Sequence, residues 1–370
     1  MAAKLRYIYC VMLIAFTSVH LCAQPAQPQA WASPEVESMY NDARNYMSNG
    51  NFAQAIAIFQ QAIQIAPGQM VLHRELGRAY YLMGNYDEAK KVLEPIITSG
   101  DADEQTYQAM ATSLALSGEK KKARAMLQKG IQRFPHSGLL YHDMGKMYDD
   151  EDENVYALET WLDGIQADPA YHVNYYEAAR TYMNTNRPVW AIIYGELFVN
   201  IERQTPRADE TKQMLMDAYK KLFTDVAPSD ELPKYKGGKT ASAVVPFEEA
   251  VRSTYLKLSP VVSDGINAEN LAMLRARFSI EWSYKYAAQY PFALFTYYDQ
   301  LLRNGYFDIY NEWLFGKAEG QQAYESWNAF HNGDMPKFET WVAANPMRPA
   351  ETDFYNDKQV DGIFSKKKKK

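Results

Sequence analysis

The feature that most constrains this chain is a repeat of 34 residues, which occurs five times without a gap between positions 36 and 205. The twentieth residue of every copy is alanine, and the eighth is always glycine or alanine. The twentieth residues are Ala55, Ala89, Ala123, Ala157 and Ala191, and the eighth are Ala43, Gly77, Ala111, Gly145 and Ala179. A fixed period of this length is typical of folds in which similar units stack on one another. Such folds present a long grooved surface, which favours binding over a buried reaction centre.

The remaining places of the repeat predict antiparallel helix pairs. Small residues at places 8 and 20 let two helices approach closely, and the large residues fill the space that is left. The turn between the helices carries a residue that tolerates a left-handed backbone. The turn residues are Gly50, Gly84, Gly118, Asp152 and Asn186. Prolines at 67, 135 and 169 are expected to stop the second helix of their repeats.

This pattern resembles the tetratricopeptide repeat family, which has characteristic residues at places 4, 8, 11, 20, 24 and 32. Place 11 is Tyr46, Tyr80, Leu114, Tyr148 and Tyr182, and place 24 is Phe59, Leu93, Leu127, Trp161 and Gly195. The last repeat departs from the pattern, because Gly195 replaces a large residue and its proline comes late, at Pro206. The resemblance covers 170 of the 370 residues. It implies an all-α fold: an α-solenoid of antiparallel helix pairs, followed here by an aromatic-rich helical C-terminal region with degenerate repeat-like pairs.

The first 23 residues have the features of a secretory signal peptide. Lys4 and Arg6 precede an apolar run, Tyr7 to Phe16, and cleavage is expected after Ala23. The run is too short to cross a bilayer, so no transmembrane segment is expected in the mature chain. We therefore predict a periplasmic or secreted protein, with a Gram-negative bacterium as the source.

Both cysteines of the chain lie in this leader. Cys22 raises the alternative of a lipoprotein, but His20 and Leu21 before it fit a lipoprotein signal poorly. With Cys10 also removed, the mature chain would have no disulfide, no thiolate metal site and no cysteine nucleophile.

Composition and charge divide the chain further. We predict a signal peptide at 1–23, a flexible spacer at 24–35, five repeats at 36–205, a capping helix at 206–223, a linker at 224–246, a helical C-terminal domain at 247–346 and a tail at 347–370. The tail ends in Lys366–Lys370, which we interpret as a solvated end; weak contact with an anionic surface is the alternative.

The C-terminal half is dense in aromatic residues: 19 of the 64 residues from Phe278 to Trp341 are Phe, Tyr or Trp. Segments 301–314 and 330–342 each look like a helix pair with an Asn-Gly turn, as in the repeats. Tyr310 and Phe338 stand where the repeats have alanine, and their bulk would force the helices apart. We interpret most of the rings as core residues, with an exposed stacking platform as the alternative.

Charge and missing motifs exclude several functions. The formal net charge is −6, or −8 without the leader, so binding of nucleic acid by bulk electrostatics is not expected. No metalloprotease, nucleophile-elbow, phosphate-loop or dinucleotide motif is present. Asp150-x-Asp152-x-Asn154 lacks the glycine and the final glutamate of a calcium loop and is interpreted as a solvated turn. We predict no enzyme activity, no cofactor and no metal site.

Places 5, 9 and 12 of the first helices form a stripe that faces away from the packing stripe, and in the resembled family it lines the concave groove. Place 9 holds a cation in four of the five repeats. The predicted partner-binding residues are Tyr40, Arg44, Arg74, Arg78, Tyr81, Thr112, His142, Lys146, Tyr176 and Arg180. The hypothesis is that they bind an extended acidic segment. The alternative is that the cations balance neighbouring acids within the stack.

From these features we expect an exported, non-enzymatic scaffold or adaptor that binds a protein or peptide partner in the groove. One alternative is a glycan-binding accessory protein of the bacterial envelope, which would use the C-terminal aromatic rings. A further alternative is a hydrolase whose site lies in the C-terminal half, which would require a closed pocket lined by paired carboxylates.

Overall fold

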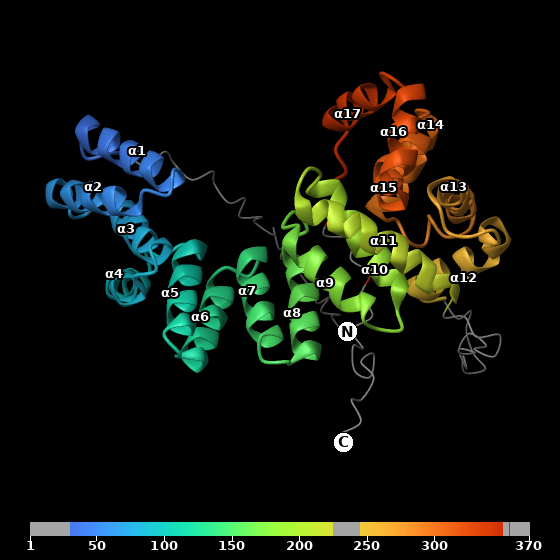
Figure 1. Ribbon diagram of the computed structural model, residues 1–370. Helices are drawn as coiled ribbons and strands as arrows, with labels where there is room; N and C mark the ends of the chain where they lie inside the picture. Colours follow the sequence, from blue (N-terminus) through green and yellow to red (C-terminus); the bar gives the residue numbers. More distant parts are fainter. Residues whose placement is uncertain (1–29, 225–244, 351–354, 356–370) are drawn as a thin grey trace, which may run out of the picture. The chain divides into compact units, whose positions relative to one another are not determined.

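The computed structural model describes residues 30–224, 245–350 and 355, and these contain helices α1 to α17, one 3-10 helix and no strand (Figure 1). The predicted all-α fold of helix pairs is therefore confirmed. The predicted leader, the first half of the spacer, nearly all of the linker and the Lys366–Lys370 run lie outside the described residues.

Each repeat forms two helices. Their bounds are α1 Pro34–Ser48, α2 Phe52–Ile65, α3 Met70–Leu82, α4 Tyr86–Ser99, α5 Glu104–Leu116, α6 Lys120–Arg133, α7 Gly138–Asp149, α8 Asn154–Ala167, α9 Val173–Met183 and α10 Pro188–Ile201. Pro67, Pro135 and Pro169 each follow the end of a second helix, as predicted.

The C-terminal part continues with a further set of helices. They are α11 Pro206–Thr224, α12 Phe247–Lys257, η1 Ser259–Val262, α13 Ala268–Lys285, α14 Ala293–Arg303, α15 Phe307–Glu319, α16 Gln321–Phe330 and α17 Asp334–Ala344. The described residues divide into two compact units, one that ends at Leu72 and one that begins at His73.

Close helix packing accounts for the small residues of the repeat. All five alanines at place 20 are fully buried. At place 8 of the fourth repeat, a Cβ atom on Gly145 would lie 2.3 Å from Nε1 of Trp161, the place-24 residue of the same repeat. Gly77 and Leu93 stand in the same relation in the second repeat. The large residue at place 24 of one helix therefore fills the space that the missing side chain leaves on the other.

The turns within the repeats use a left-handed residue in four cases out of five. Gly50, Gly84 and Gly118 have φ between 76° and 84°, and among the described residues other than glycine only Asp152 has a positive φ, at 60°. The prediction for Asn186 was therefore wrong. That turn is closed instead by the hydroxyl of Thr185, which accepts a hydrogen bond of 3.1 Å from the Arg187 amide, before Pro188 begins α10.

In the first unit, α1 and α2 pack together, and the segment before α1 is held against them. The ring of Trp31 lies 4.7 Å from that of Tyr40. The Gln69 side chain accepts a hydrogen bond from the amide of Ala32 and donates one to the carbonyl of Ala30. Residues 30–33, predicted to be part of the flexible spacer, thus have specific contacts, which composition alone does not encode.

In the second unit, the last repeat is buried among helices that follow it. Every residue of α10 from Pro188 to Asn200 is buried, and one apolar cluster extends from Leu158 in α8 to Met347. Gly195, the departure at place 24, lies where α11 approaches: a Cβ atom there would be 3.0 Å from Leu215. The glycine is explained by this contact, because a large side chain would push α11 away.

A buried ion pair joins the last repeat to the C-terminal helices. Glu196 of α10 and Arg275 of α13 are both fully buried and form an ion pair. The hydroxyls of Tyr298 in α14 and Tyr310 in α15 each donate a 2.6 Å hydrogen bond to the Glu196 carboxylate. Since unpaired charges are costly inside a protein, this network requires α10, α13, α14 and α15 to pack in one arrangement.

Candidate functional site

The predicted stripe residues of the second unit lie on α3, α5, α7 and α9. None of them is fully buried, which a binding surface requires. Of these, Arg74, Arg78, Tyr81, Thr112, His142 and Tyr176 are half-buried, and Lys146 and Arg180 are exposed. The two remaining residues, Tyr40 and Arg44, belong to the first unit, where Tyr40 is half-buried beneath Trp31 and Arg44 is exposed.

On α3, both predicted arginines have carboxylate partners. Arg74 Nε lies 3.1 Å from Oδ2 of Asp103, which caps the start of α5. Arg78 Nη1 lies 3.1 Å from Oε1 of Glu75, one turn earlier on the same helix. At this end of the stripe, the contacts agree with the alternative interpretation, in which the cations balance acids within the stack.

The middle of the stripe is uncharged. Thr112 of α5 stands next to Tyr81 of α3: burial raises the pKa of Tyr81, and a hydrogen bond with Thr112 acts in the opposite direction. The third repeat therefore separates the arginines of α3 from the charged residues of α7 and α9, and the predicted basic column is not continuous.

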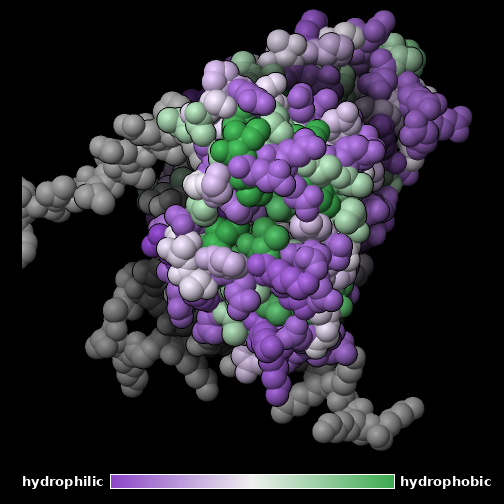
Figure 2. Space-filling model, turned by 90° about the vertical axis from the view of Figure 1, so that its left-hand side faces the viewer, coloured by the Kyte–Doolittle hydropathy of each residue, from purple (hydrophilic) through white to green (hydrophobic). Residues whose placement is uncertain are grey.

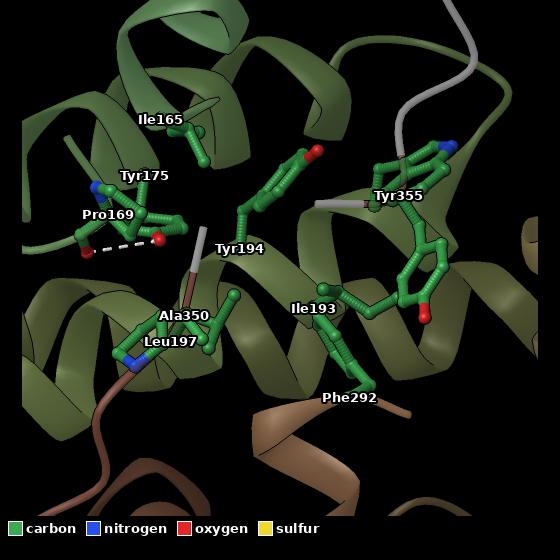
Figure 3. Close-up of a pocket in the computed structure, with 11 residues that line it drawn as sticks. Ile165, Pro169, Tyr175, Ile193, Tyr194, Leu197, Phe292, Ala350 and Tyr355 are labelled. Carbon is green, nitrogen blue, oxygen red and sulfur yellow. Dashed lines mark hydrogen bonds between the residues drawn. The ribbon is translucent and has the colours of Figure 1, made fainter. Parts of the chain in front are cut away.

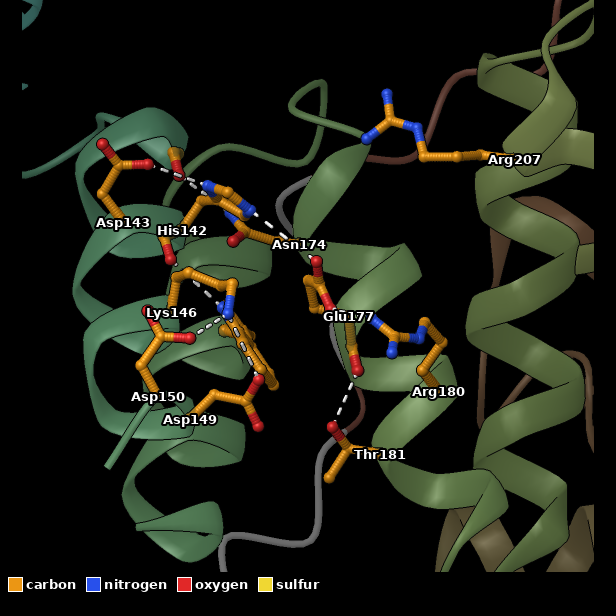
Figure 4. A network of polar contacts seen from close by, with 12 residues as sticks. His142, Asp143, Lys146, Asp149, Asp150, Asn174, Glu177, Arg180, Thr181 and Arg207 are labelled. Carbon is orange, nitrogen blue, oxygen red and sulfur yellow. Dashed lines mark hydrogen bonds and ion pairs between the residues drawn. The ribbon is translucent and has the colours of Figure 1, made fainter. Parts of the chain in front are cut away.

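The charged residues of α7 and α9 form two groups of contacts, one around His142 and one around Lys146 (Figure 4). His142 Nδ1 lies 2.9 Å from Oδ1 of Asp143, and Nε2 lies 3.9 Å from Oε1 of Glu177 on α9. Burial lowers the pKa of His142, but the hydrogen bonds and charges of the two carboxylates outweigh this effect and raise it to about 9. His142 is therefore a cation at neutral pH.

Exposure separates the two signs of charge in this region. The side chains of Lys146, Arg180 and Arg207 are 47%, 56% and 44% exposed. Glu177, the partner of Arg180, and Glu202, the partner of Arg207, are only 12% and 8% exposed. Arg180 and Arg207 therefore face solvent, while the carboxylates that orient them lie underneath. Lys146 differs, because Asp149 and Asp150, which contact it, are themselves partly exposed.

Two rings complete this end of the stripe. The Arg180 guanidinium stands 5.3 Å from the centre of the Tyr176 ring, and Arg207 of α11 stands 5.7 Å from the same ring. Tyr176 in turn packs against Phe198 of α10 at 5.1 Å. Cation–π contact holds the two guanidinium groups over an aromatic base. We call His142, Lys146, Tyr176, Arg180 and Arg207 the α7–α9 cationic surface.

The sequence prediction omitted the acids of this region and Arg207. Glu75, Asp143 and Glu177 all occupy place 6 of their repeats. Glu75 and Glu177 stand three residues before a place-9 cation, and this spacing, which brings side chains together on a helix, was a signal that could have found them. Arg207 lies after the last repeat, so no repeat position pointed to it.

The acidic run at 149–153 has a structural explanation. Glu151 and Glu153 both form ion pairs with Arg124 of α6, the helix that precedes this repeat. Asp149 and Asp150 contact Lys146. In the described part of the chain, no three His, Cys, Asp or Glu side chains are grouped as metal ligands.

The rings of the C-terminal half are largely core residues. Phe278, Trp282, Phe295, Tyr298 and Tyr310 are all buried, and Tyr255 and Phe278 stack with their centres 4.1 Å apart. Tyr310 and Phe338, at the places of the repeat alanine, are fully buried as well. The glycan-binding alternative needs exposed rings that can form a stacking platform. Tyr284 is an exposed ring in this half of the chain.

A pocket lies where the C-terminal segment meets α8, α9 and α10 (Figure 3). It is lined by aromatic and aliphatic residues, among them Tyr175, Tyr194 and Tyr355, and by no carboxylate. Its free volume of about 20 Å³ is room for about one water molecule. The paired carboxylates and the space that a hydrolase needs are absent from this pocket.

Apolar residues also reach the surface. Figure 2 shows apolar residues gathered among hydrophilic ones on the face it displays. In the first unit, Tyr46 and Ile65 are exposed apolar side chains. Among the described residues, no helix combines the length and apolar character needed to cross a bilayer.

Comparison with known proteins finds a family match over part of the repeats. Residues 46–114 match the model of the tetratricopeptide repeat family. A human protein, Protein O-mannosyl-transferase TMTC2, is 26% identical over 114 residues, which are 30% of this chain and 14% of that protein. The chain thus spans about one seventh of this curated relative, and the likeness concerns that part alone.

The solved structures that resemble this chain have low sequence identity to it. The crystal structure of MamA is 19% identical and matches 48% of this chain and 93% of its own, with a TM-score of 0.34. PilF of Pseudomonas aeruginosa is 16% identical and matches 50% of this chain and 85% of its own, with a TM-score of 0.43. PilW, described as a type IV pilus biogenesis factor, is 15% identical and matches 52% and 87%, with a TM-score of 0.42.

Proposed function

Since this chain carries tetratricopeptide repeats, a fold that supports protein–protein interaction, we propose that it is an exported, non-enzymatic adaptor that binds an extended, acidic segment of a partner protein. The segment lies along the first helices of the repeats of the second unit, and its carboxylates contact the α7–α9 cationic surface. Tyr81 and Thr112 contact the uncharged part of the segment.

The observation that carries this proposal is the separation of charge by exposure. Arg180 and Arg207 are about half exposed, whereas their partners Glu177 and Glu202 lie beneath them. Lys146 is also about half exposed, but its partners Asp149 and Asp150 are partly exposed as well. Buried carboxylates hold the two arginines in place without covering them, so these cations remain able to accept a second carboxylate. Exposed ion pairs contribute about 0–1 kcal/mol each, so a partner can replace them at little cost.

Binding of defined peptides tests this proposal. A short labelled peptide rich in Asp and Glu is compared with its Asn and Gln counterpart by fluorescence anisotropy at low and moderate salt. The acidic peptide is expected to bind more tightly, with an affinity that falls as salt rises. Substituting Lys146→Glu and Arg180→Glu together should weaken its binding at least about tenfold, since attraction becomes repulsion at two contacts.

The chain offers a matched control for this charge reversal. Lys91 on α4 and Lys122 on α6 are exposed lysines on second helices, off the stripe, and both form ion pairs with an acid three residues earlier. Lys91→Glu with Lys122→Glu makes the same change in net charge. Equal loss of binding in both double variants, or equal affinity for the acidic and amide peptides, contradicts an acidic ligand on this surface.

Export is a separate part of the proposal and rests on the leader pattern. We expect the mature protein to begin at Gln24, after removal of Met1–Ala23. Terminal sequencing of the protein from fractionated cells measures this directly. A cytoplasmic protein with an intact leader contradicts export but leaves the peptide-binding proposal standing.

A further inference from the structure

An open cleft lies in the second unit, between the turn that joins α10 to α11 and the helices α15, α16 and α17. It contains about 1220 Å³ of free space, including solvent at its mouth. Arg203, Lys212 and Lys317 line it together with Trp313. None of these residues belongs to the α7–α9 cationic surface.

Two cations stand over the same indole ring in this cleft. Arg203 Cζ lies 4.1 Å from the ring centre of Trp313, and Lys212 Nζ lies 4.0 Å from it. The two charges are therefore at most about 8 Å apart, the sum of these distances. Like charges at this separation repel each other, and the repulsion is stronger where a side chain is largely removed from water, as that of Lys212 is. Contact with the ring compensates each cation only in part.

The positive charge of the cleft is incompletely paired. Arg203 Nη1 is buried and has no hydrogen-bond partner in the described structure. Among the described residues, neither Arg203 nor Lys317 has a carboxylate within 4.0 Å, and Lys212 has one, Asp209, at 3.7 Å. The Asp209 side chain is 66% exposed, while that of Lys212 is 9% exposed. Burial lowers the pKa of Lys212 to about 8 and also lowers that of Arg203.

Three carboxylates line the cleft, and all belong to exposed residues: Asp209, Glu210 and Glu339. Arg203 and Lys212 are thus less exposed than the acids. The first turn of α11 also faces this region, with Thr205 Oγ1 accepting a hydrogen bond from the Ala208 amide. The positive end of that helix dipole favours an anion nearby.

We propose that this cleft binds an oxyanion, a carboxylate or a phosphate, between the Arg203 guanidinium and the Lys212 ammonium group. The anion lies between the two repelling charges and compensates them both. Trp313 supports the apolar part of the molecule that carries the anion. This site is independent of the repeat stripe and of the function proposed for it.

Calorimetric titration of the full-length protein tests the proposal, with sodium phosphate and sodium succinate as probes at constant ionic strength. Saturable binding at one site is expected for at least one of them, and the two arms separate a phosphate from a carboxylate ligand. Affinity for succinate should fall by up to about tenfold from pH 7 to pH 9, because Lys212, with a pKa of about 8, loses its proton.

A matched pair of variants identifies the site. Lys212 and Lys220 both lie on α11, and each forms an ion pair with the aspartate three residues earlier, but Lys220 is exposed. Lys212→Met should weaken binding at least about tenfold, and Lys220→Met should leave it unchanged. Arg203→Gln should also weaken binding, which provides a second variant if Lys212→Met fails to fold.

Three outcomes overturn the proposal. They are no saturable binding of either anion by the unaltered protein, equal loss of binding in the Lys220→Met protein, and retention of full affinity in both the Lys212→Met and the Arg203→Gln proteins. Each would mean that the cations are held by the ring and the exposed acids alone.

Discussion

At the scale of single residues, burial decides what a charge does in this protein. Glu196 and Arg275 are fully buried and bind each other and two tyrosine hydroxyls. Lys146 and Arg180 have comparable partners but remain about half exposed. The first kind of pair specifies how helices pack, whereas the second contributes little to stability and remains available to a ligand.

Arg275→Met leaves the Glu196 carboxylate buried without its cation, so we expect the free energy of unfolding to fall by about 3–5 kcal/mol. Adding Glu196→Gln removes the uncompensated charge and should restore part of the loss. Urea unfolding of the two single variants and the double variant measures the coupling. If the losses simply add, the two residues are not coupled.

The pKa of His142 predicts a pH dependence of stability. The folded pKa, about 9, lies above the ordinary value of 6.5, so the stabilisation is fully present below about pH 6.5 and is lost as the pH rises through 9. We expect His142→Gln to remove on the order of 2–3 kcal/mol of unfolding free energy at pH 6 and much less at pH 9.5.

Comparison of the variant with the unaltered protein isolates this effect. Lys212, whose pKa of about 8 lies in the same range, is present in both proteins and cancels. The ring-proton NMR signal of His142, followed with pH, gives its pKa directly. A midpoint near 6.5 would mean that Asp143 and Glu177 do not stabilise the charged imidazole.

At the scale of elements, the helix pair depends on one small residue facing one large one. In the fourth repeat, Gly145 of α7 lies against the indole of Trp161, which is fixed by a 3.2 Å hydrogen bond from Nε1 to the carbonyl of His142. In the last repeat, the glycine is at place 24 instead, and α11 occupies the space. The same rule of close packing therefore produces both the pattern and its exception.

Gly145→Val should separate α7 from α8 and lower the free energy of unfolding by about 1–3 kcal/mol or more, because the indole cannot move without losing its hydrogen bond. Ala125→Val is the control, since Ala125 is exposed on α6 and should accept valine with a change of about 0.5 kcal/mol or less. Chemical unfolding measures both. Equal stability of the two variants would show that place 8 has no steric role.

At the scale of the whole molecule, the second unit is one packed body. It contains the later repeats together with the C-terminal helices. Trp190 of α10 packs against Phe247 of α12 with ring centres 5.8 Å apart, and Tyr219 of α11 packs against Phe315 of α15 at 5.9 Å. Loss of the C-terminal helices would therefore expose the core of the last repeat and not only a helix surface.

A chain shortened to end at Thr224 should be unstable or aggregate, because fully exposing a large apolar side chain costs about 1.5–3 kcal/mol and several would be exposed at once. We expect increased binding of a hydrophobic dye, loss of a cooperative thermal transition and self-association in sedimentation. A monomeric shortened chain that unfolds as cooperatively as the full chain would contradict the shared core.

Much of the fold could be predicted because the packing role of each place in the repeat depends on contacts within one helix pair. Ala123 and Ala157 are buried, Gly84 and Asp152 are left-handed, and Pro135 follows a helix end, each as its place in the period indicated. The candidate site could be predicted only in part. The stripe side chains lie on the first helices and are partly exposed, but their contacts with the acids and with Arg207 depend on neighbouring helices.

The sequence by itself determined the helix pairs, their turns and the small residues that let them nest, because these properties repeat every 34 residues and depend on contacts within a pair. Only the tertiary structure decided which charges are covered and which face solvent, and that Glu196 meets Arg275 across 79 positions of chain. Such long-range pairs leave no local pattern, because the partner of a buried charge is chosen by how whole helices pack and not by its neighbours in sequence.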